Sequence, residues 1–507
     1  MRSLVAAEGS PEPTTTRSAA KVLDAESPSD SPTPKSPVAT PASRRSDGPG
    51  RASLDTSAGL RTEADRGEAS FWSSKWLHAG SLALLFIAVA TAYNALVPLY
   101  EAPDEAAHVS YVHHIQRTGR IPEITDTYEA VGPPLYHAAG AGVLKLLGLS
   151  QPLLPMPTNP EFPGQPNYYL HTPAEDDLPF RGPVLSHHVL RMISTLFGAG
   201  TVVFIYLIVR LLFPCRPLLA WSAGANTALL PQFAFVGGAV MNDTTLAFFS
   251  ASAIYFSFRF MKEGSAIWVL AAAGSLSLGF LTEVSMAVTA AVCALAVFFF
   301  CPLPWRRRAI SVGLLAAAPL AVAGWFYVGH LLQYEVFFPV DALRTCPGCS
   351  VSPLSPGLPL DHPNYRGAFQ SLLDRSYWFV GGGMNVYVVD AMYQFLDILA
   401  GMALGGAILI IVRRNISTFQ QRGLLLLGAL FVLALVEIML VSVRISYQPQ
   451  GRYLFIAQPA IALLFAIGLA ALFQPDAQRD HVASLLLPVI LFGLNVGILT
   501  LTLPTVY

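Results

Sequence analysis

The run LHAGSLALLFIAVATAYNALV, residues 77–97, indicates the fold class of this chain. It contains no Asp, Glu, Lys or Arg, and its length matches the roughly 20 residues that a helix needs to cross a bilayer core. Comparable runs recur along the chain, which is 53% hydrophobic and only 12% charged. They lack the alternation of polar and apolar residues that is typical of β-barrel strands. We therefore expect an all-α polytopic membrane protein.

Eleven apolar runs are candidate membrane spans. They cover 77–97, 187–213, 217–239, 243–261, 266–283, 284–302, 309–333, 389–412, 423–443, 453–473 and 483–503. The boundary at 283 is the weakest, because 266–302 also reads as one broken hairpin. The segment PLYHAAGAGVLKLLGL, residues 134–149, is short for a crossing and contains Lys145, so we expect it to lie on the membrane surface.

Basic residues between the spans indicate the topology, because cytoplasmic loops hold the excess of Lys and Arg. If the N-terminus is cytoplasmic and 134–149 does not cross, the cytoplasmic loops contain Arg216, Arg259, Lys262, Arg306, Arg307, Arg308, Arg413 and Arg414. This topology leaves two large external segments, about 98–186 and 334–388. The chemistry is then expected on the extracytoplasmic face of a cell membrane.

Residues 1–70 differ in composition from the rest of the chain. They are rich in Ser, Thr, Pro and Ala and show no apolar periodicity. Such a composition cannot bury enough apolar surface to offset the entropy of ordering, so we expect a disordered cytoplasmic tail before a transmembrane domain over 76–507. The net charge of −1 provides no basic surface, so the expected partner is the lipid bilayer and not nucleic acid.

The stretch EAPDEAAHVSY, residues 101–111, gathers acids and a histidine directly after the first span. If a helix begins near Pro103, Asp104 and His108 share one face and Glu105 points elsewhere. Proline and acidic residues in a first turn suit a helix start. Two interpretations are open: a well-capped surface helix with solvated acids, or a set of carboxylates that does chemistry.

Other motifs follow the acidic one in a fixed order. They are EAVGPPLYH at 129–137, HHVLRMIS at 187–194, MND at 241–243 and QGRYLF at 450–455. Together these motifs resemble a family of predicted bacterial membrane proteins, which is similar in turn to the GT-C superfamily of glycosyltransferases. That superfamily includes protein mannosyltransferases and aminoarabinose transferases. The resemblance runs from about residue 76 to about 473.

The resemblance implies a GT-C-like fold and a reaction on the external face. In that reaction, a sugar passes from a polyprenyl-phosphate donor to a glycan, lipid or protein of the cell envelope, with inversion at the anomeric carbon. Asp104 matches the general base of the first external loop, and Glu105 beside it is a neighbour or a metal ligand. Some members use a divalent cation such as Mg²⁺ or Mn²⁺ near this acid and others do not, so the metal requirement stays open.

The remaining candidate residues are expected to bind substrate. Cations stabilise a departing phosphate, which makes Arg452 and Arg191 candidates for that contact. The other expected substrate-binding residues are Glu101, His108, Glu129, Tyr136, Asn242, Asp243 and Gln450.

Two departures from the family pattern keep other functions open. Glu283 stands where many relatives have Lys, and Gly329 with His330 stands where many have Arg-Asn. A non-catalytic assembly protein is one alternative. A transporter or flippase of a lipid-linked envelope intermediate is another, although no internal repeat supports it.

TCPGCS at 345–350 places Cys346 and Cys349 in the second external segment. A local disulfide or free thiols are favoured over half of a zinc site, because no second cysteine pair lies on that side.

Overall fold

A computed structural model describes residues 56–149, 154–155, 157–162, 165–172, 175, 178–336, 339–345, 356–413, 416–473 and 482–507. The chain divides into two units, Met1–Ala64 and Asp65–Tyr507. Of the stretch expected to be a tail, residues 1–55 lie outside the described residues, and the first helix begins at Thr56. Cys346 and Cys349 also lie outside them.

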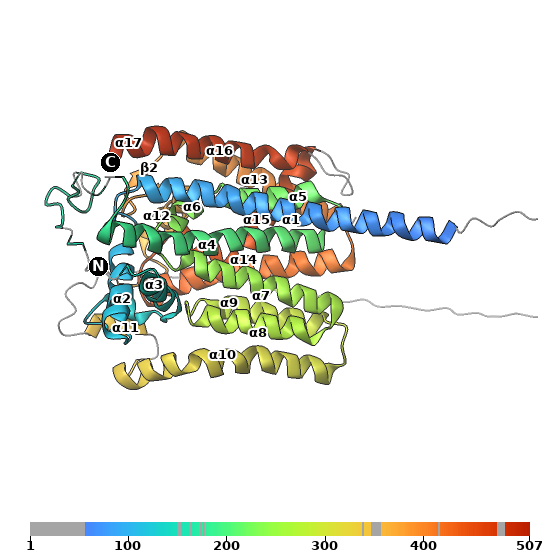
Figure 1. The fold of residues 1–507 in the computed structure, drawn as a ribbon, viewed down its shortest axis with the longest axis horizontal. Helices are drawn as coiled ribbons and strands as arrows, with labels where there is room; N and C mark the ends of the chain where they lie inside the picture. Colours follow the sequence, from blue (N-terminus) through green and yellow to red (C-terminus); the bar gives the residue numbers. More distant parts are fainter. Residues whose placement is uncertain are drawn as a thin grey trace, which may run out of the picture. The chain divides into compact units, whose positions relative to one another are not determined.

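Helices make up most of the described residues (Figure 1). The longer ones are α1 (Thr56–Leu96), α4 (Gly182–Leu212), α7 (Asp243–Glu263), α10 (Trp305–Tyr334), α13 (Asp390–Arg413), α14 (Thr418–Arg444) and α15 (Gln458–Phe473). The shorter ones are α2 (Glu105–Thr118), α3 (Leu135–Leu146), α5 (Pro217–Ala228), α6 (Pro231–Gly237), α8 (Ala266–Phe280), α9 (Met286–Leu295), α11 (Pro339–Thr345), α12 (Ala368–Trp378), α16 (Leu486–Gly497) and α17 (Leu503–Val506).

Short elements complete the described structure. The 3₁₀ turns are η1 (Tyr128–Val131), η4 (Pro363–Arg366), η5 (Gly451–Ala457) and η6 (Val482–Leu485), and the π-helical turns are η3 (Ala296–Phe300) and η7 (Ile498–Thr502). Strands β1 (Val380–Gly381) and β2 (Val386–Tyr387) pair in antiparallel fashion.

Among the described residues, seven helical segments are long and apolar enough to cross a membrane. They are Lys75–Leu96, Gly182–Leu212, Trp305–Tyr334, Asp390–Arg413, Thr418–Arg444, Gly451–Leu472 and Ala483–Val506. Two shorter apolar helices cover Ala266–Phe280 and Met286–Phe300. The fold class predicted from the sequence, an all-α polytopic membrane protein, is therefore confirmed, whereas eleven crossings remain a prediction.

One predicted span is broken in the structure. The run 217–239 was expected to form a single helix, but α5 ends at Ala228 and α6 begins at Pro231. Proline has no backbone N–H to continue the helix before it and suits the first position of a new one. After the interruption, α6 contacts α12 and η5.

The most deeply buried span is the one that carries the QGRYLF motif. Of the apolar window in Gly451–Leu472, 94% is buried, against 28% for Trp305–Tyr334. Figure 1 accordingly shows α10 at one edge of the bundle, whereas α4, with 67% of its apolar window buried, lies farther inside. Helices α2, α3 and α11 lie together at one end of the bundle, so the first external segment contacts the ends of the spans.

Candidate functional site

The acidic motif forms a turn that separates two neighbouring carboxylates. Asp104 adopts a left-handed backbone conformation, with φ 60° and ψ −1°, directly before α2 begins at Glu105. Asp tolerates this conformation better than most residues. The amide of His108 donates to the Asp104 carbonyl at 3.1 Å, which continues the first turn of α2. As a result Asp104 and His108 face a cavity, while Glu105 points away from it.

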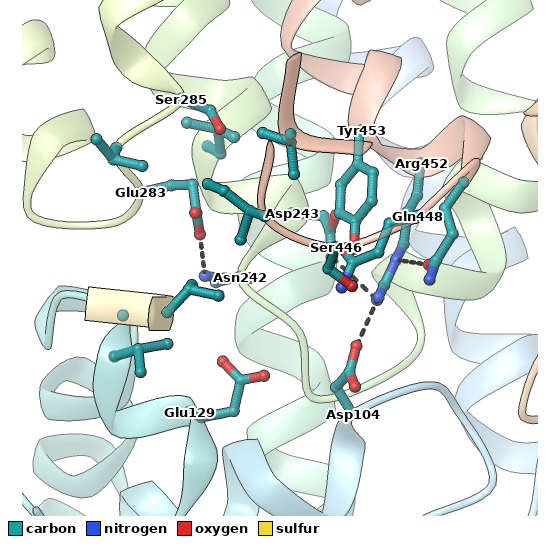
Figure 2. A pocket seen from close by; sticks show the side chains of 18 of the residues that line it. Asp104, Glu129, Asn242, Asp243, Glu283, Ser285, Ser446, Gln448, Arg452 and Tyr453 are labelled. Atoms are coloured by element: carbon teal, nitrogen blue, oxygen red, sulfur yellow. Dashed lines mark hydrogen bonds and ion pairs between the residues drawn. The ribbon is translucent and has the colours of Figure 1, made fainter. Parts of the chain in front are cut away.

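The cavity has a volume of about 480 Å³ and lies between the first external segment and the ends of the spans. Five carboxylates line it, and Arg452 is the one Lys or Arg among its described lining residues. The carboxylates come from Asp104, Glu129, Asp243, Glu283 and Glu437. An apolar wall continues from this acidic part and is formed by Ile438 and Val441 of α14 and by Ile445 directly after that helix. Figure 2 shows that Arg452 and Asp104 approach each other across the cavity.

Arg452 joins two distant parts of the sequence within the cavity. Its guanidinium donates from Nη2 to Asp104 Oδ2 at 2.5 Å and from Nε to Gln450 Oε1 at 2.7 Å. Its Nη1 lies 3.8 Å from Asp243 Oδ2. The other oxygen of Asp104 accepts from the Tyr128 hydroxyl at 2.9 Å. Burial alone would raise the pKa of Asp104, but the charge and hydrogen bond of Arg452, together with His108 and the Tyr128 hydroxyl, hold that pKa below its ordinary value.

Glu129 has a different environment in the same cavity. Its nearest ion-pair partner is His108, with Nδ1 3.7 Å from Oε2, and its side chain is 18% exposed. His108 Nδ1 is also 2.9 Å from His137 Nε2, and the His137 ring stacks on Tyr111 with centroids 3.9 Å apart. Burial lowers the pKa of His108 to about 4, so this histidine is neutral near pH 7. Burial and the charge of Asp104 raise the pKa of Glu129 well above its ordinary value.

Glu283 lies in the turn between α8 and α9, outside both helices. One of its carboxylate oxygens accepts from the Asn242 amide at 3.2 Å, as Figure 2 shows. Burial and the charge of Asp243 raise the pKa of Glu283 to about 7. The position expected from relatives to carry a cation therefore adds an acid to the cavity.

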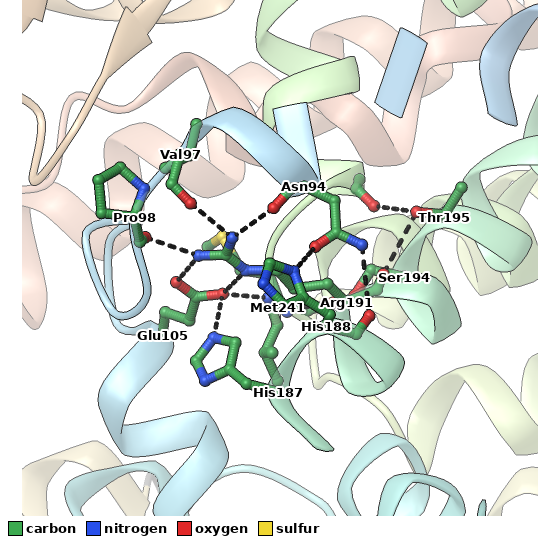
Figure 3. A network of polar contacts seen from close by, with 12 residues as sticks. Asn94, Val97, Pro98, Glu105, His187, His188, Arg191, Ser194, Thr195 and Met241 are labelled. Atoms are coloured by element: carbon green, nitrogen blue, oxygen red, sulfur yellow. Dashed lines mark hydrogen bonds and ion pairs between the residues drawn. The ribbon is translucent and has the colours of Figure 1, made fainter. Parts of the chain in front are cut away.

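Glu105 and Arg191 form a buried ion pair behind the cavity (Figure 3). Arg191 donates from Nε to Oε1 at 2.7 Å and from Nη2 to Oε2 at 2.8 Å. Glu105 also accepts from His187 Nε2 and from the backbone amide of Val240. The charge of Arg191 holds the pKa of Glu105 well below its ordinary range, although burial would raise it.

Arg191 also binds the carboxyl end of α1. It donates to the carbonyls of Asn94, Val97 and Pro98 at 2.7–2.9 Å. Carbonyls in the last turn of a helix have no partner within that helix, so a buried arginine satisfies them. Neither Arg191 nor Glu105 lines the cavity, and their contacts serve the structure of the first external segment.

Two further expected residues also lie outside the cavity lining. Glu101 is 1% exposed and accepts from the amides of Tyr168 and Tyr169 and from His171 Nε2, each at 2.9 Å. Tyr136 places its hydroxyl 2.7 Å from Ser194 Oγ. The expected residues that do line the cavity are Asp104, His108, Glu129, Asn242, Asp243, Gln450 and Arg452.

The sequence analysis missed some of the cavity residues. Glu437 stands within the apolar run 423–443, and an acid inside a span is a recognisable signal of a functional site. Tyr128 gives no such signal, because its contact with Asp104 depends on the fold of η1.

The residues considered for a divalent cation do not converge on one point. Glu105 has four hydrogen bonds from Arg191, His187 and Val240, so its oxygens are not directed toward Asp104. Within the part of the chain that the structure describes, no group of three or more His, Cys, Asp or Glu side chains is arranged to hold a metal ion. The described residues therefore do not fit a divalent cation at this site.

Comparison with known families supports the resemblance predicted from the motifs. Residues 185–327 match the model of a family described as dolichyl-phosphate-mannose-protein mannosyltransferase. The chain resembles GT-C glycosyltransferases. The matched segment includes Asn242 and Asp243, whereas Asp104 and Arg452 lie outside it. No curated protein matches the chain.

Solved structures of GT-C glycosyltransferases are similar to this chain at low identity. ArnT from Cupriavidus metallidurans in the apo state is 17% identical over 77% of this chain, with a TM-score of 0.45. This chain covers 60% of the length of that ArnT chain. The same enzyme bound to undecaprenyl phosphate is 15% identical over 83% of this chain and 73% of its own, with a TM-score of 0.47. The S. cerevisiae Pmt1-Pmt2 complex bound to the sugar donor is 20% identical over 51% of this chain and 34% of its own, with a TM-score of 0.37.

Proposed function

We propose that this protein is an integral membrane glycosyltransferase that moves a sugar from a polyprenyl-phosphate donor to a cell-envelope acceptor, with inversion, on the extracytoplasmic face. The observation that carries the proposal is a cavity in which one arginine, oriented by two oxygen acceptors, stands among carboxylates beside an apolar wall. The description of the matched family names a sugar on dolichyl phosphate, which is a polyprenyl phosphate.

Arg452 is the proposed contact of the donor phosphate. A guanidinium held by Asp104 and Gln450 is preorganised to stabilise the negative charge that develops on the leaving phosphate. The apolar residues Ile438, Val441 and Ile445 line the same cavity and suit the polyprenyl chain of the donor. A cavity carboxylate accepts the proton of the attacking hydroxyl, and Asp104 is the residue that the family motif indicates for this role.

The test compares wild-type protein with Arg452→Gln in membranes supplied with labelled polyprenyl-phosphate sugars. We expect transfer by the wild type and a loss of about 10²–10³-fold in kcat for the variant, because a charge-stabilising donor is removed. Arg444→Gln is the matched control, since Arg444 is exposed and lies outside the cavity lining. Equal rates for wild type and Arg452→Gln would refute the role of Arg452.

A flippase of a lipid-linked intermediate is the second candidate function. Glu437 of α14, a carboxylate within a span that also lines the cavity, favours it, because acids inside spans often mark transport pathways. Movement of a labelled polyprenyl-phosphate sugar across reconstituted vesicles, without transfer to any acceptor, would support this function over the first.

A further inference from the structure

Asp104 is constrained in a way that does not suit a proton acceptor. Both of its oxygens are engaged, one by Tyr128 at 2.9 Å and the other by Arg452 at 2.5 Å. A carboxylate that is ion-paired with arginine holds protons weakly, and here the charge of Arg452 and the hydrogen bonds from Arg452 and Tyr128 help to lower the pKa of Asp104 although burial opposes them. The same contact orients the guanidinium, so Asp104 suits the role of positioning residue for Arg452.

Glu129 is a cavity carboxylate that lies near Asp104 and has few polar partners of its own. Among the described residues, His108 at 3.7 Å is its one ion-pair partner, and that distance exceeds a hydrogen bond. Figure 2 shows the Glu129 carboxylate in the space between Asn242 and Asp104, pointing into the cavity. Its oxygens are therefore available to a hydroxyl that enters beside the phosphate contact.

His108 and His137 pack behind Glu129 but do not supply a positive charge to balance its carboxylate. His108 is 3% exposed and contacts His137, which is fully buried and stacked on Tyr111. Because burial keeps His108 neutral, no described residue forms an ion pair with Glu129 of the kind that Arg452 forms with Asp104. Two carboxylates in one site whose environments shift their proton affinities in opposite directions commonly take different roles.

Within the proposed glycosyltransferase reaction, we infer that Glu129, and not Asp104, takes the proton of the acceptor hydroxyl, while Asp104 positions Arg452. The inference rests on the proposed function and assigns a catalytic residue within it.

The proposed step balances as follows. The acceptor oxygen forms a bond to C1 of the sugar as the bond from C1 to the carrier phosphate breaks. The electron pair of the broken bond stays on the phosphate oxygen, next to Arg452. The acceptor proton moves to a carboxylate oxygen of Glu129 and returns to water once the products leave.

The test measures the pH dependence of transfer in membranes for wild type, Glu129→Gln and Asp104→Asn. Since a base must be ionised, wild-type kcat falls as the pH is lowered through the raised pKa of Glu129. Glu129→Gln loses about 10²–10⁴-fold in kcat and keeps its KM for the donor, and its remaining kcat no longer decreases as the pH is lowered. Asp104→Asn raises the KM for the donor, because Arg452 loses the group that orients it. Its kcat still decreases as the pH is lowered.

Other charged and titratable groups face Glu129 and need controls. They are Asp104, His108, Tyr128, Asp243, Glu283 and Arg452. If Glu129 is the titrating base, the kcat of Glu283→Gln decreases with falling pH as it does in the wild type. Glu129→Asp, which keeps a carboxylate, retains a pH-dependent rate. Glu123→Gln, on the exposed part of the same segment, leaves kcat and KM unchanged.

The outcomes separate this assignment from the proposed function. If the wild type transfers sugar and Glu129→Gln has the same kcat and pH dependence, the assignment is overturned and the function stands. The same holds if Asp104→Asn alone loses the decrease of kcat at low pH. Absence of transfer by the wild type from every donor overturns the function and the assignment together. Thermal unfolding in detergent excludes loss of folding, and an unfolded Glu129→Gln would make Glu129→Asp the deciding variant.

Discussion

Two neighbouring acids point in different directions in this protein because the first of them, Asp104, leaves helical geometry. The left-handed backbone of Asp104 turns its side chain toward Arg452, while Glu105 begins α2 and points toward Arg191. Each carboxylate binds a different arginine, from segments more than 250 residues apart. A single backbone conformation therefore separates the cavity from the buried network behind it.

The Glu105–Arg191 pair is expected to be required for stability. Glu105→Gln leaves the guanidinium buried without its counter-charge, and breaking a buried pair in this way costs about 3–5 kcal/mol. We expect a clearly lower melting temperature of the protein in detergent, followed by intrinsic fluorescence. Glu123→Gln, at an exposed position, is the control, and an unchanged melting temperature for Glu105→Gln would contradict the prediction.

The lowered pKa of His108 predicts that the folded protein loses stability in acid. Its pKa is about 4 in the folded protein and about 6.5 when unfolded, so between these values the unfolded chain binds the extra proton. The free energy of unfolding then falls as the pH drops from 6.5 to 4, by about 3 kcal/mol for this group. Melting temperatures of wild type and His108→Gln across this range test it, and the variant should lose less stability. Parallel curves would contradict the prediction.

Helices α13 and α15 can approach closely only because both carry glycine where they cross. A Cβ atom at Gly406 would overlap the carbonyl of Gly468, and one at Gly468 would overlap the carbonyl of Ala403. Close crossings at small residues are typical of membrane helices. Gly406→Ala should therefore destabilise the protein by about 1–3 kcal/mol, measured by thermal unfolding in detergent. The neighbouring Gly405→Ala, which meets no atom within 4 Å, should be tolerated, and equal effects would refute the argument.

The first external segment is held by a histidine between two carboxylates. His171 places Nδ1 2.9 Å from Glu175 and Nε2 2.9 Å from Glu101, and these hydrogen bonds raise its pKa although burial opposes them. A raised histidine pKa adds stability that is complete below about pH 6.5 and is lost as the pH rises through the folded value.

This contact predicts how amide exchange near Glu101 depends on pH. The amides of Tyr168 and Tyr169, which donate to Glu101, should lose protection from hydrogen exchange as the pH rises, after correction for the intrinsic rate. His171→Gln should lose protection at every pH, whereas His171→Lys keeps a positive charge and should retain it. Protection that is independent of both pH and residue 171 would contradict the prediction.

The sequence predicted the helices better than it predicted the site. Apolar length and charge are local properties, so most spans could be placed within a few residues, although Pro231 already indicated the break after α5. Asp104 and Arg452 are 348 positions apart in the sequence, and their proximity was expected only from a resemblance between motifs. The role of Arg191 could not be predicted, because its partners are carbonyls at the end of another helix.

At the scale of the whole molecule, the sidedness of the membrane protein is the principal prediction. The distribution of basic residues predicts that Glu123 is external and that Cys215, an exposed free cysteine, is cytoplasmic. In variants that retain one cysteine, a membrane-impermeant maleimide should label Glu123→Cys in intact cells and should label Cys215 only after permeabilisation. Labelling of Cys215 in intact cells would reverse the topology.

The charge balance of the cavity has a consequence for turnover. The donor is a phosphodiester with one negative charge, whereas the released polyprenyl phosphate is a monoester that gains most of a second charge near pH 7. Arg452 can balance one charge, and the other ionisable groups around it are mainly carboxylates. In the proposed reaction, the released polyprenyl phosphate therefore binds less favourably in the cavity than the donor did. The transfer step thus favours release of the carrier into the bilayer.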